Sequence, residues 1–150
     1  MSDRALKLAD YLPYIMSVSA TEVSRLIARA YEDRFGISIP QWRLLAHLGD
    51  GPATPLQIGQ MTVMDKVTVS RAARGLLQRG LVEGRRNDAD GRSHILSMTA
   101  IGEELYRAIA PAALAFERDL LADWTPQEVD SLKSQLRRLQ QSASKLSQRR

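Results

Sequence analysis

The segment DKVTVSRAARGLLQRGLV, residues 65–82, decides how the rest of the chain is interpreted. On a helix of 100° per residue its apolar side chains gather on one side, and they are Val69, Ala72, Ala73, Leu76 and Leu77. The opposite side is small, polar and cationic, and no acidic residue lies between Lys66 and Arg79. A solvated helix face usually mixes both signs of charge. This pattern therefore favours a surface that lies against phosphates and base edges.

Both ends of this segment carry helix-terminating signals. Asp65 is a good N-cap, because its carboxylate can accept from the free N–H groups of the first turn. Gly80 stands where a left-handed residue commonly ends a helix. The segment predicts a short, capped helix with one apolar and one cationic face.

The preceding residues predict two more helices. Ser38-Ile39-Pro40-Gln41 has capping-box spacing and opens a helix that is closed by the turn at residues 49–52. Thr54-Pro55-Leu56-Gln57 repeats the pattern and opens a short helix that ends near Met61. Two short helices joined by a tight turn form the helix-turn-helix pattern. We expect Thr54 and Gln57 to touch the DNA backbone.

The hydrophobic period changes after Gly80. Residues 81–86 and 94–99 are typical of two strands, and the turn-forming residues 87–93 separate them. A β-hairpin beside a helix-turn-helix is a wing. Arg92 at its tip is expected to enter the minor groove. Arg85 and Arg86 on the approach strand are expected to meet phosphates or solvent.

Long helices are predicted on both sides of this region. Residues 1–35 favour one helix, broken near its start by Pro13 and ended by Gly36, and residues 99–124 favour another, kinked at Pro111. A capping box at Thr125 opens a last helix with a short heptad seam, which packs either in a dimer or within the chain. The predicted fold class is mainly α with a small β-hairpin wing, a winged helix-turn-helix in one domain over residues 1–150.

Charge and composition narrow the class of function. The net charge is +4; residues 52–100 carry +3 and residues 126–150 carry +4, which fits nucleic acid or an anionic surface. The chain has no cysteine, so disulfides and thiolate zinc sites are excluded. No apolar run approaches the roughly 18 residues that span a bilayer, and no signal-peptide pattern opens the chain. We expect a soluble, cytoplasmic protein that does not bind membranes.

An enzyme is not indicated. The sequence has no glycine-rich phosphate loop, no G-x-S-x-G and no metal-ligand spacing. Its two histidines, His47 and His94, lie in separate predicted elements. No catalytic residue, metal or cofactor is predicted.

In their order and in their short sequence motifs, these elements resemble the MarR family of winged-helix transcription regulators. The resemblance rests on Pro40–Leu45, Met64–Arg71, Leu76–Val82, the wing Asp88–Ser93 and the following Leu96–Gly102. It covers nearly the whole chain and is strongest over residues 37–104. One departure is Asp65, because a neutral serine is common at that position in the family.

The resemblance implies a homodimer that binds a pseudo-palindromic operator in double-stranded DNA. Residues 1–36 and 101–148 would form the dimerisation helices, and residues 37–100 the DNA-binding lobe. By this likeness Asp90 would hold Arg92 through a charge-assisted pair. The residues expected at the major groove are Lys66, Val67, Thr68, Ser70, Arg71 and Arg74.

The resemblance also implies a repressor that a small aromatic or phenolic anion, or its acyl thioester, releases from DNA. Helices that meet at the junction of the two lobes offer aromatic walls, a cation and an imidazole for such an effector. These residues are Tyr11, Tyr14, Ser19, Trp42, Arg43 and His47.

One alternative stays open at this point. A helical protein–protein adaptor could use the winged helix and the C-terminal heptad seam to bind a partner protein. Substitution of Arg71 and Arg92 would separate the two interpretations, because an adaptor does not need these cations.

Overall fold

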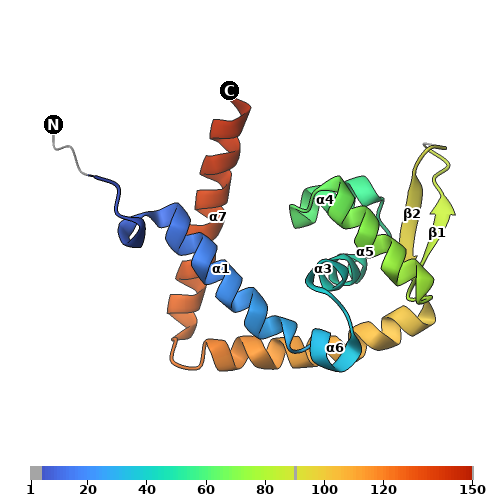
Figure 1. Ribbon diagram of the computed structural model, residues 1–150, viewed down its shortest axis with the longest axis horizontal. Helices are drawn as coiled ribbons and strands as arrows, with labels where there is room; N and C mark the ends of the chain where they lie inside the picture. The colour runs from blue at the N-terminus through green and yellow to red at the C-terminus, as the bar shows by residue number, and fades with distance from the viewer. Residues whose placement is uncertain (1–4, 90, 150) are drawn as a thin grey trace. The chain divides into compact units, whose positions relative to one another are not determined.

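The computed structural model describes residues 5–89 and 91–149. The chain divides after Phe116 into two compact units. The prediction of a mainly helical fold with one small β-hairpin is confirmed. In chain order (Figure 1), the elements are η1 (Leu8–Asp10), α1 (Leu12–Ala28), α2 (Glu32–Phe35), α3 (Ile39–Leu48), α4 (Pro55–Thr62), α5 (Lys66–Gln78), β1 (Val82–Arg86), β2 (His94–Met98), α6 (Ala100–Leu120) and α7 (Pro126–Gln148).

The core lies in the first unit, where α3, α4, α5 and the hairpin pack together (Figure 1). The apolar face of α5 is buried as predicted through Val69, Ala72, Ala73 and Leu76. Leu77 was predicted on that face and is instead 43% exposed. It lies about 80° round the helix from Val69, at the edge of the apolar stripe, and the neighbouring helices cover a narrower arc.

Capping boxes start α3 and α4 as predicted. The Ser38 hydroxyl accepts from the Gln41 N–H at 3.3 Å, and the Gln41 Oε1 accepts from the Ser38 N–H at 3.0 Å. Thr54 and Gln57 repeat this exchange at 3.2 and 2.9 Å. Each pair satisfies two backbone donors that the helix itself cannot.

The wing is a two-stranded antiparallel hairpin in which Val82 pairs with Met98 and Arg86 with His94. A third segment, missed from the sequence, joins it. The Ala53 N–H donates to the Leu96 carbonyl at 3.0 Å, and the Leu96 N–H donates back at 2.9 Å. This exchange ties the hairpin to the residue that precedes the N-cap of α4, so the wing is anchored to the helix-turn-helix.

The predicted helix over residues 1–35 is wrong in its limits. α1 begins at Leu12 with Pro13 in its first turn, where a missing N–H costs nothing, so this proline starts the helix instead of breaking it. The helix ends at Ala28, and Tyr31 then turns into the core, where it is 2% exposed. Gly36 ends α2 with a φ of 63°, as predicted.

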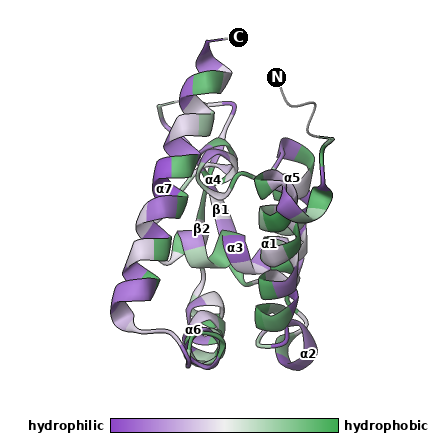
Figure 2. Cartoon of the chain, turned by 90° about the vertical axis from the view of Figure 1, so that its left-hand side faces the viewer, coloured by the Kyte–Doolittle hydropathy of each residue, from purple (hydrophilic) through white to green (hydrophobic). Residues whose placement is uncertain are grey.

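The second unit contains the end of α6 and all of α7. The capping box predicted at Thr125 is present, since its hydroxyl accepts from the Glu128 N–H at 3.2 Å and the Glu128 carboxylate accepts from the Thr125 N–H at 2.8 Å. Helix α6 ends at Leu120, earlier than predicted. No described residue of α7 is buried, and hydrophobic residues recur along this otherwise hydrophilic helix (Figure 2). Within the described ranges, no helix is both long and apolar enough to cross a membrane.

The junction between α5 and α6 depends on a glycine. The Thr99 hydroxyl donates to the Gly80 carbonyl at 2.6 Å and accepts from the Gly102 N–H at 3.1 Å. This places the buried Gly102 against the backbone of Leu81, where a Cβ would overlap the Leu81 carbonyl.

We therefore expect Gly102→Ala to destabilise the fold by about 2 kcal/mol or more, since backbone cannot move aside as a flexible side chain can. A helical glycine replaced by alanine normally gains about 0.5–1 kcal/mol, so the sign is the test. Thermal unfolding measures it. Gly84→Ala in β1 is the control for an added Cβ that meets no backbone, because this Cβ would meet the Leu96 side chain at an ordinary 3.5 Å. Equal or higher stability of Gly102→Ala would contradict the prediction.

Candidate nucleic-acid interface

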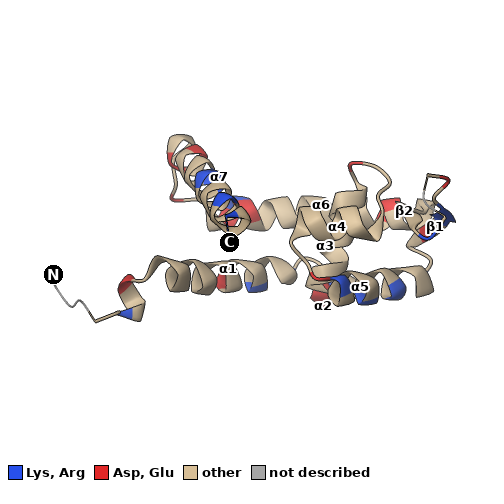
Figure 3. Cartoon of the chain, turned by 90° about the horizontal axis from the view of Figure 1, so that it is seen from above, with Lys and Arg blue, Asp and Glu red and all other residues tan. Residues whose placement is uncertain are grey.

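The solvent side of α5 carries cations without acids. Lys66, Ser70, Arg71 and Arg74 are exposed, and Figure 3 shows the basic positions along this helix with no acidic position between them. Val67 lies on the same side and is 59% exposed. The opposite side is held in the core, so this helix can present only its cationic side to a partner.

The N-terminus of α5 is capped as predicted. An Asp65 carboxylate oxygen accepts from the Thr68 N–H at 2.7 Å, and the other accepts from the Thr68 hydroxyl at 3.0 Å. The bond from the Thr68 N–H is the main reason why the pKa of Asp65 lies below its ordinary value of 3.8. Thr68 was predicted at the major groove, but it is half-buried and its hydroxyl is engaged in this cap.

The C-terminus of α5 is anchored by a residue that the sequence analysis did not single out. The Arg79 guanidinium donates from Nη1 to the Gly36 carbonyl and from Nη2 to the Phe35 carbonyl, both at 3.1 Å. Gly80 follows with a φ of 67°, in the left-handed conformation predicted for it.

The wing brings the predicted hairpin arginines to the surface. Arg85, Arg86 and Arg92 are exposed. The Asn87 amide donates to the Ser93 hydroxyl at 3.0 Å and so closes the base of the turn. Asp90 lies outside the described residues, so its pairing with Arg92 stays a prediction. Thr54 and Gln57, predicted at the DNA backbone, are both engaged in the α4 capping box.

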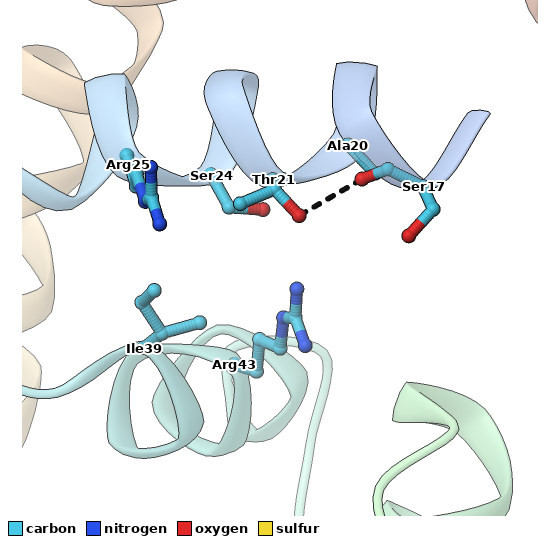
Figure 4. Close-up of a pocket in the computed structure, with 7 residues that line it drawn as sticks. All are labelled: Ser17, Ala20, Thr21, Ser24, Arg25, Ile39 and Arg43. Atoms are coloured by element: carbon cyan, nitrogen blue, oxygen red, sulfur yellow. Dashed lines mark hydrogen bonds between the residues drawn. The ribbon is translucent and has the colours of Figure 1, made fainter. Parts of the chain in front are cut away.

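A cleft of about 470 Å³ lies between α1 and α3. The guanidinium groups of Arg25 and Arg43 extend into it from opposite sides (Figure 4). Arg25 also contacts Glu22 at 3.5 Å, but both side chains are at least 70% exposed, so this pair is weak. Five of the seven lining residues carry a hydroxyl or a guanidinium group; the lining consists of Ser17, Ala20, Thr21, Ser24, Arg25, Ile39 and Arg43.

Of the six predicted effector residues, only Arg43 lines this cleft. Trp42 is stacked between Tyr31 and Tyr106, with ring centroids 5.6 and 5.7 Å away. The other four are not among the lining residues. Tyr11 and Tyr14 are 44% and 45% exposed at the start of α1, Ser19 is exposed on the same helix, and His47 is half-buried near the end of α3.

The charge of Arg43 reaches the aromatic stack. Burial raises the pKa of the Tyr31 phenol, the carboxylate of Glu32 adds to the rise, and the nearby Arg43 opposes it. The sequence analysis did not predict the α1 residues that line the cleft. A polar stripe at positions 17, 21, 24 and 25 of a largely apolar helix could have indicated them.

The chain is similar to known proteins in both sequence and fold. A model of the MarR family matches residues 35–93, from the end of α2 to the wing. The uncharacterized HTH-type transcriptional regulator YwoH of Bacillus subtilis (strain 168) is 31% identical over 112 residues, which cover 72% of this chain and 81% of YwoH. The chain belongs to the MarR family.

Solved structures agree with this MarR assignment. A probable transcriptional regulator from Pseudomonas aeruginosa has a TM-score of 0.78 and 29% identity, covering 89% of this chain and 99% of its own. A MarR-family regulator from Silicibacter pomeroyi has a TM-score of 0.76 and 27% identity, covering 91% of this chain and 94% of its own. This MarR protein is a transcriptional regulator with a DNA-binding winged-helix fold, and its relatives are regulators rather than enzymes.

The residues that the MarR model matches include the cationic surface but only part of the cleft. They include α5 and the cationic positions of the wing. They also include the α3 wall of the cleft, with Ile39 and Arg43, but the α1 wall with Arg25 lies outside residues 35–93. The cationic surface therefore lies within the matched region, whereas only the α3 wall of the cleft does.

The cap of α5 generates a pH-dependent prediction. Asp65→Ala should lower the melting temperature at pH 7 because the Thr68 N–H loses its acceptor. A lowered folded-state pKa means that the stabilisation is complete above the ordinary pKa of 3.8 and is lost as the pH falls through the folded value. The melting temperatures of wild type and Asp65→Ala should therefore converge in acid.

Asp65→Ser is the control for this series. Its hydroxyl can still cap the helix but does not ionise in this range, so its melting temperature should stay near that of wild type at neutral pH. A gap between wild type and Asp65→Ala that stays constant into acid would show that the ionised carboxylate is not the source of the stability.

Proposed function

We propose that this regulator binds a pseudo-palindromic operator as a homodimer, with α5 in the major groove and Arg92 in the adjacent minor groove. The observation that carries the proposal is the division of α5. One face is buried in the core, and the other presents Lys66, Arg71 and Arg74 without an acid among them. Arginine reads guanine through two hydrogen bonds, and Val67 can pack on a thymine methyl.

A structural neighbour supports operator binding by this fold. A MarR mutant from E. coli was solved complexed with operator DNA, and it has a TM-score of 0.76 and 20% identity over 85% of this chain. Sequence identity of 20% shows a common fold but not common DNA contacts. The proposed contacts therefore rest on the residues of this chain. Thr54 and Gln57, at the start of α4, would lie near the phosphates.

Exposed apolar side chains on the outer helices support the homodimer. Along α1, Leu12, Ile15 and Val18 are 53%, 42% and 45% exposed, and on α7 Leu136 and Leu146 are 45% and 65% exposed. A second copy of the chain would bury this apolar area, and burial of apolar surface stabilises an association by about 25 cal/mol per Å². Residues 1–36 and 101–148 would then form the dimerisation helices, and residues 37–100 the DNA-binding lobe.

We further propose that the protein is a repressor whose release ligand is a small aromatic acid bound in the cleft. Arg25 and Arg43 would hold the carboxylate, hydroxyls of α1 would bind its polar substituents, and Ile39 would pack on the ring. Two structural neighbours support a ligand-responsive protein: BpsR of Bordetella bronchiseptica, whose DNA binding is regulated by 6-hydroxynicotinic acid, and PcaV of Streptomyces coelicolor, solved with its natural ligand.

Fluorescence anisotropy with the DNA upstream of the protein's own gene tests DNA binding. Wild type should prefer this fragment to random DNA by about 10³-fold, with affinity falling steeply as salt rises. Arg71→Ala should lower operator affinity by about tenfold to a hundredfold, the value of one bidentate base contact. Arg149→Ala, an exposed arginine at the C-cap of α7 and outside the proposed dimerisation helices, is the charge-matched control and should change little. Absence of binding even at low salt would favour a protein–protein adaptor.

Titration calorimetry with aromatic acids tests the ligand. Benzoate, 4-hydroxybenzoate or 6-hydroxynicotinate should bind, whereas the uncharged 4-hydroxybenzamide should not. Arg43→Ala should weaken binding by about tenfold or more, because a hydrogen bond to a charged group is worth about 1.5–3 kcal/mol. Arg34→Ala on α2 is the control outside the cleft lining. Unchanged affinity in both Arg25→Ala and Arg43→Ala would exclude this cleft as the site.

A further inference from the structure

Arg79 is a cation at the end of a DNA-binding helix, yet its guanidinium is turned toward protein. It occupies the C-cap of α5 and donates to two successive carbonyls, Gly36 O and Phe35 O, both at 3.1 Å. These acceptors lie 43 and 44 residues away in the sequence. A planar guanidinium spans two carbonyls in a fixed geometry that a lysine ammonium cannot reproduce.

The acceptors are suited to a cation. Phe35 is the last residue of α2 and Gly36 is its left-handed C-cap, so their carbonyls point out of a helix C-terminus and lack helical partners. The partial negative charge at such an end strengthens hydrogen bonds from arginine. The contact therefore joins the end of α2 to the end of α5.

This contact adds to the burial at the end of α5, where Leu76 and Leu81 are 0% and 4% exposed. Val69, Ala72, Ala73 and Leu76 fix the helix along one side, but Leu77 and Gln78 in the last turn are exposed. Close packing of Gln41 over Gly75 adds a second link from α3, since a Cβ at Gly75 would lie 2.5 Å from the Gln41 amide nitrogen. Arg79 therefore holds the terminal turn together with Gln41 and with the Thr99 hydroxyl, which donates to the Gly80 carbonyl at 2.6 Å.

The length of α5 makes its end a sensitive place to hold. A helix of 13 residues is about 20 Å long, so a tilt of about 5° about one end moves the other end by about 1.7 Å. Hydrogen bonds to base edges tolerate much smaller displacements. An anchor at the C-terminus therefore sets where Lys66, Arg71 and Arg74 lie relative to the bases.

We propose that Arg79 is a positioning residue for DNA recognition, which orients α5 by anchoring its C-terminus to the α2 end and makes no phosphate contact. The proposal rests on the proposed function, in which α5 reads the major groove. It predicts that loss of the two-carbonyl contact lowers the preference for operator DNA and leaves the affinity for random DNA nearly unchanged.

The test compares wild type, Arg79→Lys and Arg79→Gln on operator and random DNA across a salt series. Arg79→Lys keeps the charge but loses the paired hydrogen bonds of the guanidinium group. Its preference for operator over random DNA should therefore fall by about tenfold or more. Both variants should keep the wild-type salt slope on random DNA. A phosphate contact would give the opposite result: near-wild-type binding by Arg79→Lys, and a slope reduced by about 0.9 in Arg79→Gln.

Amide hydrogen exchange of the free protein supplies a readout that does not depend on DNA. Exchange in residues 76–81 should rise in Arg79→Lys while that in α4 stays at the wild-type level. The control Arg149→Ala should change neither segment. Unchanged exchange, or full operator preference in Arg79→Lys, would overturn the positioning role. A third outcome combines faster exchange in Arg79→Lys with a wild type that shows no preference for operator DNA. It would refute the proposed function and leave Arg79 with a structural role only.

Discussion

The structure depends on the burial of one narrow face of α5. Val69 and Leu76 are 1% and 0% exposed, and burying such side chains is worth about 1.5–3 kcal/mol each. Ala72 and Ala73 between them are small, which lets α3 and α4 approach closely. Larger side chains there would push the helix outward, so the same residues that stabilise the fold also set how far the cationic face stands from the core.

Burial along one face leaves the ends of α5 to be fixed separately. Asp65 satisfies the first turn, and a helix N-terminus favours its negative charge. That carboxylate also places a negative charge beside the proposed phosphate surface, so the cap stabilises the helix at some cost to DNA binding. At the other end Arg79 and Gly80 stop the helix. The presented surface is thus bounded on both sides by capping chemistry.

How much of this the sequence predicts depends on the distance between partners in the chain. The three capping boxes and the left-handed Gly36 and Gly80 are local, so their patterns predicted them correctly. The strand exchange of Ala53 and the anchor of Arg79 join residues more than forty positions apart, and no local pattern specifies such partners. The cleft was missed in the same way, because its two walls come from different helices.

The position of α1 explains why the cleft must be probed from α3. Its polar residues Ser17, Thr21 and Ser24 face the cleft, while Ile15 and Val18 belong to the exposed apolar side. At 100° per residue these two sides are neighbouring faces of the same helix. A substitution in α1 therefore disturbs the proposed dimer surface and the proposed ligand site together. Arg43 reaches the same cleft from α3, outside the proposed dimerisation helices, so its removal leaves the proposed dimer surface in place.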